Sequence, residues 1–397
     1  MTASIEFFPV GNGDMTLIHL ATGKTILIDI NIRQNADNES EDDYPDVASM
    51  LRDRLSRDCE NRPYVDAFVL THPDQDHCGG LRTHFHLGSP TDWKEPEDDE
   101  PEKVVIREMW SSPLIFRRTN KEDGALSADA EAWKKEAKRR VELAKEQAAS
   151  ANELGNLIRI MGQDIHEDKM KGIEHLMVKV GDTLNAICGE RDPSFSALLL
   201  SPKVVSRDEA DELAGKNNSS IVMQYSISAK DDSIDSKAAT FLTGGDAEID
   251  IWKRIWGRNK ETPENLGYHI LQAPHHCSLG ALSYDKYNDR NGRKGKGEDC
   301  EIDKEAYSAL SQAENGASIV ASSEEPERQT GKDLAKRKYQ GIASDVDGDF
   351  YCTMTDSKDK PLKFDITDEG PKLSGKKERL AEIPAKVRKG TTDRPYA

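Results

Sequence analysis

The chain lacks the features that mark membrane and disulfide-stabilised proteins. No apolar run approaches the roughly 20 residues that a membrane-spanning helix needs. The start of the chain has no basic region followed by a long apolar segment, so no secretory signal is indicated. The 6 cysteines are scattered without a C-x-x-C pair, which indicates free thiols in a reducing compartment. We therefore expect a cytoplasmic protein that makes no membrane contact.

The chain also lacks an excess of positive charge. It has 55 Lys and Arg against 73 Asp and Glu, a formal net charge of −18 over 397 residues. Phosphate contacts dominate binding to duplex nucleic acid, so proteins that coat it are usually basic. The acidity disfavours broad nucleic-acid binding. It leaves room for a locally positive cleft, because bound metal ions would invert the local field.

The order of apolar patterns predicts an α/β domain at residues 1–370. The predicted strands cover residues 4–10, 25–30, 64–70, 195–200, 220–228, 238–243 and 269–273. Residues 127–161 are rich in Ala, Glu, Lys and Leu and predict a long helix or helix pair, interpreted as a helical insertion at about 120–165. Residues 371–397 form a basic tail that we expect to be flexible.

Four potential metal ligands lie within six residues, directly after a predicted strand. The segment reads His72-Pro-Asp74-Gln-Asp76-His77. In an extended chain the side chains at i and i+2 project together. His72 and Asp74 can therefore face one cation while Asp76 and His77 face a second. Imidazole and carboxylate donors suit Zn²⁺, Mn²⁺ or Fe.

Two further polar segments also follow predicted strands. Residues 243–246 read Thr-Gly-Gly-Asp, and the two glycines allow a close approach of backbone or metal. Asp246 also precedes a predicted helix, so a helix N-cap is the alternative reading. Residues 274–278 read Pro-His-His-Cys-Ser, which places His275 and His276 at the end of an apolar strand. The sequence thus predicts one site built from three distant segments.

Taken in order, these motifs resemble the metallo-β-lactamase superfamily. They are most similar to the hydrolase domain of the ComEC-type DNA-uptake proteins. The likeness extends to Val-Gly-Asn-Gly-Asp at residues 10–14, Ile-Leu-Ile-Asp at 26–29 and Asn-Asn-Ser-Ser-Ile-Val at 217–222. The resemblance covers roughly residues 4–280 and implies an αββα sandwich. The ComEC-type proteins carry this domain beside membrane spans. The present sequence shows no such span, so their DNA-uptake role is not expected of this chain.

The resemblance also implies a ligand set for one or two divalent ions, with Zn²⁺ or Mn²⁺ expected. The implied ligands are His72 and Asp74 for the first ion, Asp76, His77 and one of His275 and His276 for the second, and Asp246 as the bridge. The wider superfamily has a further histidine before the bridging aspartate, and no histidine here lies in a matching motif. Cys78 and Cys277 also replace the more usual apolar residue and glycine.

These features predict a metal-dependent hydrolase. The favoured prediction is a phosphodiesterase or nuclease that acts through a metal-activated hydroxide. Its substrate would be DNA, RNA or a smaller nucleotide. Asp74, Asp76 and Asp246 are the predicted catalytic carboxylates, with Asp74 or Asp76 accepting or returning a proton. Ser219 and Ser278 are predicted to bind phosphate oxygens. The alternatives are a hydrolase of small esters or lactones, and a scaffold that retains the metal site without turnover.

Overall fold

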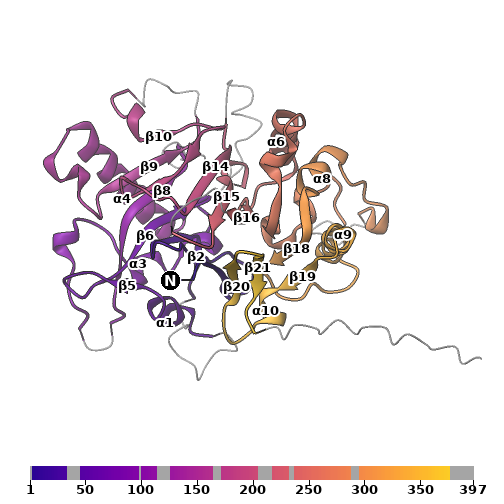
Figure 1. Ribbon diagram of the computed structural model, residues 1–397, viewed down its shortest axis with the longest axis horizontal. Helices are drawn as coiled ribbons and strands as arrows, with labels where there is room; N and C mark the ends of the chain where they lie inside the picture. Colours follow the sequence, from indigo (N-terminus) through magenta and orange to yellow (C-terminus); the bar gives the residue numbers. More distant parts are fainter. Residues whose placement is uncertain are drawn as a thin grey trace, which may run out of the picture.

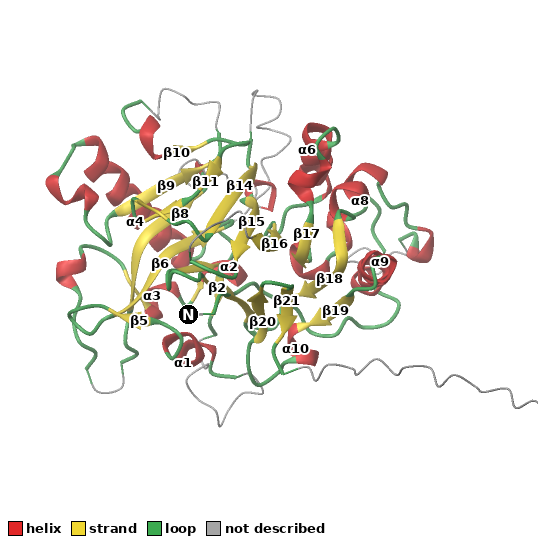
Figure 2. Cartoon of the chain, viewed as in Figure 1, coloured by secondary structure: helices red, strands yellow, loops and turns green. Residues whose placement is uncertain are grey.

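The computed structural model describes residues 2–33, 45–97, 100–113, 126–163, 171–203, 217–231, 237–287 and 295–375. Within these ranges two β-sheets face each other and helices cover their outer faces (Figures 1 and 2). The predicted flexible tail lies outside the described residues from residue 376 onward. Its first residues belong to the last strand, so the folded domain continues past residue 370.

The first sheet has 11 strands in the described residues. Its order is β10 (Met177–Val178), β9 (Leu157–Met161), β8 (Val104–Ser111), β6 (Pro63–Leu70), β3 (Thr25–Ile28), β2 (Thr16–His19), β1 (Ser4–Phe7), β20 (Leu362–Thr367) and β21 (Gly370–Leu373). Strand β5 (Ser56–Arg57) pairs with β6, and β7 (Phe85–His86) pairs with β8. Strands β3, β6, β8 and β9 run parallel, so their carboxyl ends lie at one edge.

The second sheet has 7 strands in the described residues. Its order is β11 (Thr183–Leu184), β14 (Phe195–Ser201), β15 (Val222–Ser228), β16 (Lys237–Thr243), β17 (Tyr268–Gln272), β18 (Ala313–Ala321) and β19 (Asp349–Cys352). Strands β16 to β19 are parallel. The short strands β12 (Ala186–Ile187) and β13 (Glu190–Arg191) form a separate pair, and β4 (Ile30–Asn31) bridges to residues 78 and 79.

The helices form the two outer layers. Those over the first sheet are α1 (Val47–Arg52), α2 (Gln75–Cys78), α3 (Leu81–His84) and α4 (Ala128–Lys145). Those associated with the second sheet are α6 (Ile249–Asn259), α7 (Pro274–Cys277), α8 (Lys304–Leu310), α9 (Gly331–Asp345) and α10 (Thr353–Asp356). The 3₁₀ helices are η1 (Pro90–Asp92), η3 (Ala149–Asn152), η5 (Glu174–Leu176), η6 (Asn217–Ser219), η8 (Pro263–Leu266), η9 (Leu279–Ala281) and η10 (Gly297–Asp299).

Three hydrophobic cores correspond to the three interfaces between four layers. Along a strand, successive side chains point to opposite faces, and here both faces are buried. In β16, Phe241 packs between the sheets while Leu242 packs under the outer helices. In β3 of the first sheet, Ile26 likewise packs between the two sheets, while Leu27 packs under the helices that cover the first sheet. The predicted αββα sandwich is confirmed.

The segment predicted as a helical insertion contains both a helix and a strand. Helix α4 begins after Ser127, whose side chain accepts from the backbone of Ala130, and it buries Trp133 against Phe68 at a ring distance of 5.0 Å. The prediction of helix as far as residue 161 is wrong, because Leu157–Met161 is strand β9 beside β8. Buried Ile158 and Ile160 alternate with half-buried Leu157 and Arg159, which is the period of a strand and not of a helix. Helix α4 is thus part of the outer layer that covers the first sheet.

Two other expectations bear on the molecule as a whole. Within the described residues, no helix combines the length and the apolar composition needed to cross a membrane. All six cysteines are free thiols, as predicted.

Candidate metal centre

The three predicted segments meet at one end of the sandwich, just after the carboxyl ends of β6, β16 and β17. Strand β6 ends at Leu70 and leads into His72, while β16 and β17 lead into Asp246 and the His275–His276 pair. Backbone hydrogen bonds join the segments: Ile221 N–H donates to Thr71 O at 3.0 Å, and His275 N–H donates to the carbonyl of residue 245 at 2.9 Å. The convergence predicted from the sequence is present.

The first half of the site surrounds one oxygen of Asp246. His72 Nε2 lies 3.6 Å from Asp246 Oδ2, and His275 Nε2 lies 3.5 Å from the same oxygen. Asp74 Oδ2 lies 3.7 Å from His72 Nε2. Two imidazoles and two carboxylates therefore face one small volume.

The second half surrounds the other oxygen of the same carboxylate. His77 Nε2 and His276 Nε2 lie 3.0 and 3.3 Å from Asp246 Oδ1. Asp76 Oδ2 lies 3.4 Å from His276 Nε2. The sequence left open which member of the histidine pair belongs to the site. The structure brings both to Asp246, one on each side.

These separations fit ligands that share a cation. Two donors bound to Zn²⁺ at about 2.0–2.1 Å in tetrahedral geometry lie about 3.3 Å apart. Most of the distances around Asp246 are near this value, and several exceed an ordinary hydrogen bond. His72 Nε2 is buried without a hydrogen-bond partner among the described residues. Such a buried nitrogen is costly unless something binds it, so the residues present fit a divalent metal.

Carboxylates lie on the outer side of two of the four rings, opposite the nitrogen that faces Asp246. Asp29 Oδ2 lies 2.8 Å from His77 Nδ1. Asp14 Oδ1 lies 3.2 Å from His276 Nδ1. Carboxylates in this position orient a metal-bound histidine and raise its basicity. Asp14, His77, Asp246 and His276 also offer four ligand atoms within 4.8 Å of one another. Because the Asp14 oxygens face Nδ1 atoms, we regard Asp14 as a ring partner.

The two remaining rings have neutral or partly exposed partners. Thr71 Oγ1 lies 3.1 Å from His72 Nδ1 and donates to Asp29 at 2.5 Å, which links the two halves of the site. Glu248 Oε1 lies 3.7 Å from His275 Nδ1. Sequence reasoning quoted Asp14 and Asp29 as parts of matching motifs and gave neither a role. It assigned nothing to Thr71 or Glu248.

Burial and charge shift the pKa values of these groups in opposite directions. Burial, and then the nearby His77, hold the pKa of His72 well below its usual value. For His276, burial acts downward but Asp246 and Asp14 outweigh it and raise the pKa to about 10. Burial would raise the pKa of Asp246, yet His77 and His276 hold it well below the usual range. Asp246 and Asp29 likewise outweigh burial and raise the pKa of His77 well above its usual value. These directions favour an ionised Asp246, and a cation that binds here would compete with protons on His77 and His276.

Two backbone features allow the segments to approach so closely. Gly245 has φ of 48°, and a Cβ atom there would lie 2.5 Å from Thr71 Oγ1. His275 and His276 have φ of 51° and 49°, the left-handed region that costs energy for residues with a side chain. This conformation turns two consecutive histidines toward the two oxygens of one carboxylate. The strain is located where the ligands converge.

The other predicted residues lie around the centre. Ser278 Oγ accepts a hydrogen bond from Gly280 N at 3.2 Å and lines a cavity beside the site. Ser219 is 1% exposed and is not among the residues that line this cavity. Burial raises the pKa of the Cys78 thiol to about 12, and burial raises that of Cys277 as well. Both cysteines are buried thiols, in line with packed side chains.

Comparisons with known proteins do not assign the chain to a family. No family model and no curated protein matches it. Among solved structures, the isothiocyanate hydrolase from Delia radicum gut bacteria is similar at 14% identity and a TM-score of 0.35, over 88% of this chain and 95% of that chain. This level of likeness supports no inference about activity. The superfamily and ComEC-type resemblance therefore stays a prediction from the motifs.

Proposed function

We propose that the protein is a metal-dependent hydrolase that cleaves phosphodiesters. The observation that carries this proposal is that four imidazole Nε2 atoms surround the two oxygens of Asp246, a buried carboxylate. A buried anion among four imidazoles has no evident structural purpose in a sandwich with three apolar cores. A cation on each side would satisfy all of these groups at once.

The proposed ligands form two groups, one around each carboxylate oxygen of Asp246. They are His72, Asp74, His275 and Asp246 Oδ2 on one side, and Asp76, His77, His276 and Asp246 Oδ1 on the other. His275 thus supplies the nitrogen that no sequence motif provided for the first ion. Each group has two nitrogen and two oxygen donors, a set that suits Zn²⁺ or Mn²⁺.

The side chains of Asp74, Asp76 and Asp246 differ in solvent exposure, and this difference suggests different roles. The Asp246 side chain is 4% exposed, so it holds the site together and has little access to solvent protons. The side chains of Asp74 and Asp76 are 24% and 42% exposed, which lets either exchange a proton with substrate or water. Ions bound at this site would lower the pKa of water and neutralise charge on phosphoryl oxygens. Asp74 and Asp76 remain the proposed proton carriers.

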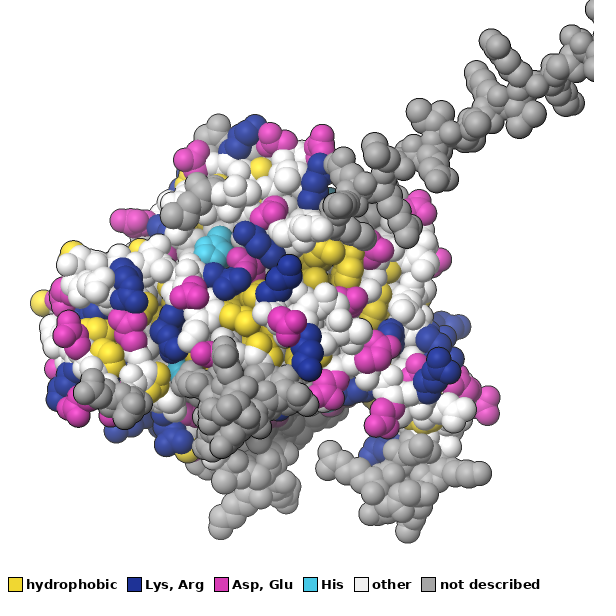
Figure 3. Space-filling model, turned by 90° about the horizontal axis from the view of Figure 1, so that it is seen from below, with side chains coloured by type: hydrophobic (Ala, Val, Ile, Leu, Met, Phe, Trp, Pro, Cys, Tyr) yellow, Lys and Arg dark blue, Asp and Glu magenta, His cyan; other side chains and the backbone are white. Residues whose placement is uncertain are grey.

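The charge distribution favours a small or single-stranded substrate over a duplex. Acidic and basic side chains are interspersed over the face seen from below (Figure 3). With a net charge of −18 the protein would repel a long polyanion except near its bound cations. We therefore propose a nucleotide-sized phosphodiester or a strand end as the substrate.

The test is metal-dependent turnover of bis(p-nitrophenyl) phosphate after purification without chelator and metal quantification. We expect the wild type to bind divalent metal and turn over this compound, and Asp246→Ala to lose metal and activity while remaining folded. Asp368→Ala, which removes a carboxylate that is 61% exposed, is the matched control and should stay active. An equally active Asp246→Ala would refute the assignment of the site.

The same preparation tests the alternatives. Turnover of a lactone panel without turnover of the phosphodiester would favour a carboxylic ester or lactone hydrolase. Absence of bound metal, together with inactivity after addition of Mn²⁺ or Zn²⁺, would favour a scaffold without turnover.

A further inference from the structure

A cavity opens beside the candidate metal centre. Its volume is about 590 Å³, and it lies between the start of α6, the residues around η9 and the start of α9. Glu248 and Ser278 line the side nearest the metal centre, since Glu248 Oε1 is 3.7 Å from His275 Nδ1. Small-molecule sites typically measure about 300–1,000 Å³. The cavity therefore suits a ligand of nucleotide size that reaches the metal centre.

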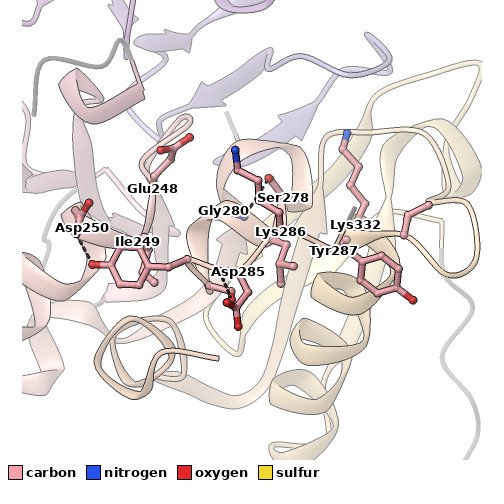
Figure 4. Close-up of a pocket in the computed structure, with 14 residues that line it drawn as sticks. Glu248, Ile249, Asp250, Ser278, Gly280, Asp285, Lys286, Tyr287 and Lys332 are labelled. Carbon is pink, nitrogen blue, oxygen red and sulfur yellow. Dashed lines mark hydrogen bonds between the residues drawn. The ribbon is translucent and has the colours of Figure 1, made fainter. Parts of the chain in front are cut away.

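Two lysines give the cavity its positive charge. Figure 4 shows that Lys286 and Lys332 extend in the same direction as Glu248. Lys332 Nζ donates to Asn12 Oδ1 at 3.0 Å, in the turn that also carries Asp14. Among the described residues, neither Lys286 nor Lys332 has an ion pair with a carboxylate within 4.0 Å. An ammonium has three donors, so Lys332 keeps two for a ligand.

The acidic residues of the cavity are already paired. Glu248 accepts from Asn217 Nδ2 at 3.1 Å, and Asp250 accepts from the hydroxyl of Tyr284. Asp285 lies 2.9 Å from the ammonium of Lys296. Glu248 and Asp250 keep their negative charge, because their amide and hydroxyl donors are neutral, so an anion in this cavity would be held by direct contact with Lys286 and Lys332 and not by the net charge of the lining.

Aromatic side chains add a second recognition element. Tyr284 and Tyr287 both line the cavity, and Tyr284 is 58% exposed. Nucleobases stack on such rings, whatever the base. The backbone of α9 begins at Gly331 beside Lys332, so the positive end of this helix also faces the cavity. Charge and stacking together favour a base-bearing phosphate over an aliphatic acid.

We propose that this cavity binds the base-bearing, phosphorylated end of a small phosphodiester, with Lys332 and Lys286 contacting its phosphates. The inference rests on the proposed function for the reaction at the metal centre. Lys332, which is hydrogen-bonded to the Asn12 turn, contacts the phosphate near the metal centre. Lys286 contacts a second phosphate farther along the cavity. The protein therefore prefers a substrate with a terminal phosphate.

Direct binding tests the site without requiring turnover. Thymidine 3′,5′-bisphosphate is titrated calorimetrically into the full-length wild type, Lys332→Ala, Lys332→Gln and Lys286→Ala. Lys332→Gln retains a hydrogen-bond donor for Asn12 but no charge. Loss of one charge-assisted hydrogen bond should raise the Kd about tenfold in each variant. Lys363→Ala, at a half-buried lysine of β20 that does not line the cavity, is the matched control and should bind like the wild type.

Equal affinities for the wild type and all three variants, no binding at all, or equal binding of unphosphorylated thymidine would overturn the site. A second readout compares cleavage of pTpT and TpT. The wild type should prefer pTpT by about tenfold in kcat/KM through a lower KM, and Lys286→Ala should lose that preference. Lysine-dependent binding without any turnover would refute only the proposed function. Metal-dependent turnover without lysine-dependent binding would refute only this inference.

Discussion

Replacement of Asp29 by asparagine tests whether the outer carboxylates hold the ligands in place. Asp29 is fully buried and accepts three hydrogen bonds: from Thr71 N at 2.7 Å, from Thr71 Oγ1 at 2.5 Å and from His77 Nδ1 at 2.8 Å. All three partners donate to it. Asparagine offers one accepting oxygen and one NH₂ group, so in either orientation at least one donor faces another donor.

The expected cost has two parts. A buried donor without an acceptor destabilises the fold by about 1–3 kcal/mol. Where the NH₂ group faces His77, that ring avoids the clash only by moving its proton from Nδ1 to Nε2, the nitrogen that faces Asp246, and it can then no longer bind a cation through Nε2. Where the amide oxygen faces His77, the clash falls on Thr71 N–H and the ring loses the charged partner that raises its basicity. In both cases metal affinity should fall, by about 10- to 100-fold.

The assay compares Asp29→Asn with a matched control, Asp66→Asn. Asp66 lies in β6, is 3% exposed and accepts from Thr25 and Arg107 on the same sheet. Chemical denaturation should show a comparable loss of stability in both variants. Competition with a chromophoric chelator should show weaker metal binding in Asp29→Asn alone. Equal metal affinity in Asp29→Asn and the wild type would refute the role of Asp29.

Three further predictions concern the backbone, the outer layer and acid stability. Gly245→Ala should destabilise the fold by at least about 1–3 kcal/mol, measured by denaturation, because the new Cβ meets Thr71 Oγ1. Gly257→Ala, at an exposed position in the last turn of α6, should instead stabilise it by up to about 0.5–1 kcal/mol, and the opposite order would contradict the packing described. Trp133→Ala should cost about 3–5 kcal/mol, whereas a loss below about 1 kcal/mol would show that α4 is a peripheral addition. Burial opposes ionisation of Glu136, but two neighbouring arginines hold its pKa below the usual value. The resulting stability is present above the ordinary pKa of about 4.3 and is lost as pH falls through the lower folded pKa. The wild type should therefore lose unfolding free energy below that pH more steeply than Glu136→Gln, and parallel profiles would contradict this.

The parts of the site that sequence reasoning found share one property. Residues 72–77 combine four ligand types in one short segment, and Asp246 follows two glycines at the end of an apolar strand. Such local patterns are visible without a structure. The wider layout followed as well, because β3 and the second half of β6 contain continuous apolar runs of the kind that sheets buried on both faces require.

The parts that were missed depend on contacts between distant residues. Asp14 is a single carboxylate in a turn, and its partner His276 lies in α7, after a strand of the other sheet. Nothing near Asp14 in the sequence indicates that pairing. The role of His275 was missed for a similar reason, since it depends on a left-handed backbone that no motif predicts. Helix α9 was not predicted although Leu334 and Tyr339 are buried on its inner face.

The central claim is that Asp246 bridges two cations, each held by residues from distant segments. Anomalous diffraction from crystals grown with Zn²⁺ or Mn²⁺ tests it most directly. We predict two peaks on opposite sides of Asp246, one beside His72 and His275 and the other beside His77 and His276. Ordered crystals without a peak at Asp246, or with peaks only elsewhere on the protein, would contradict the claim.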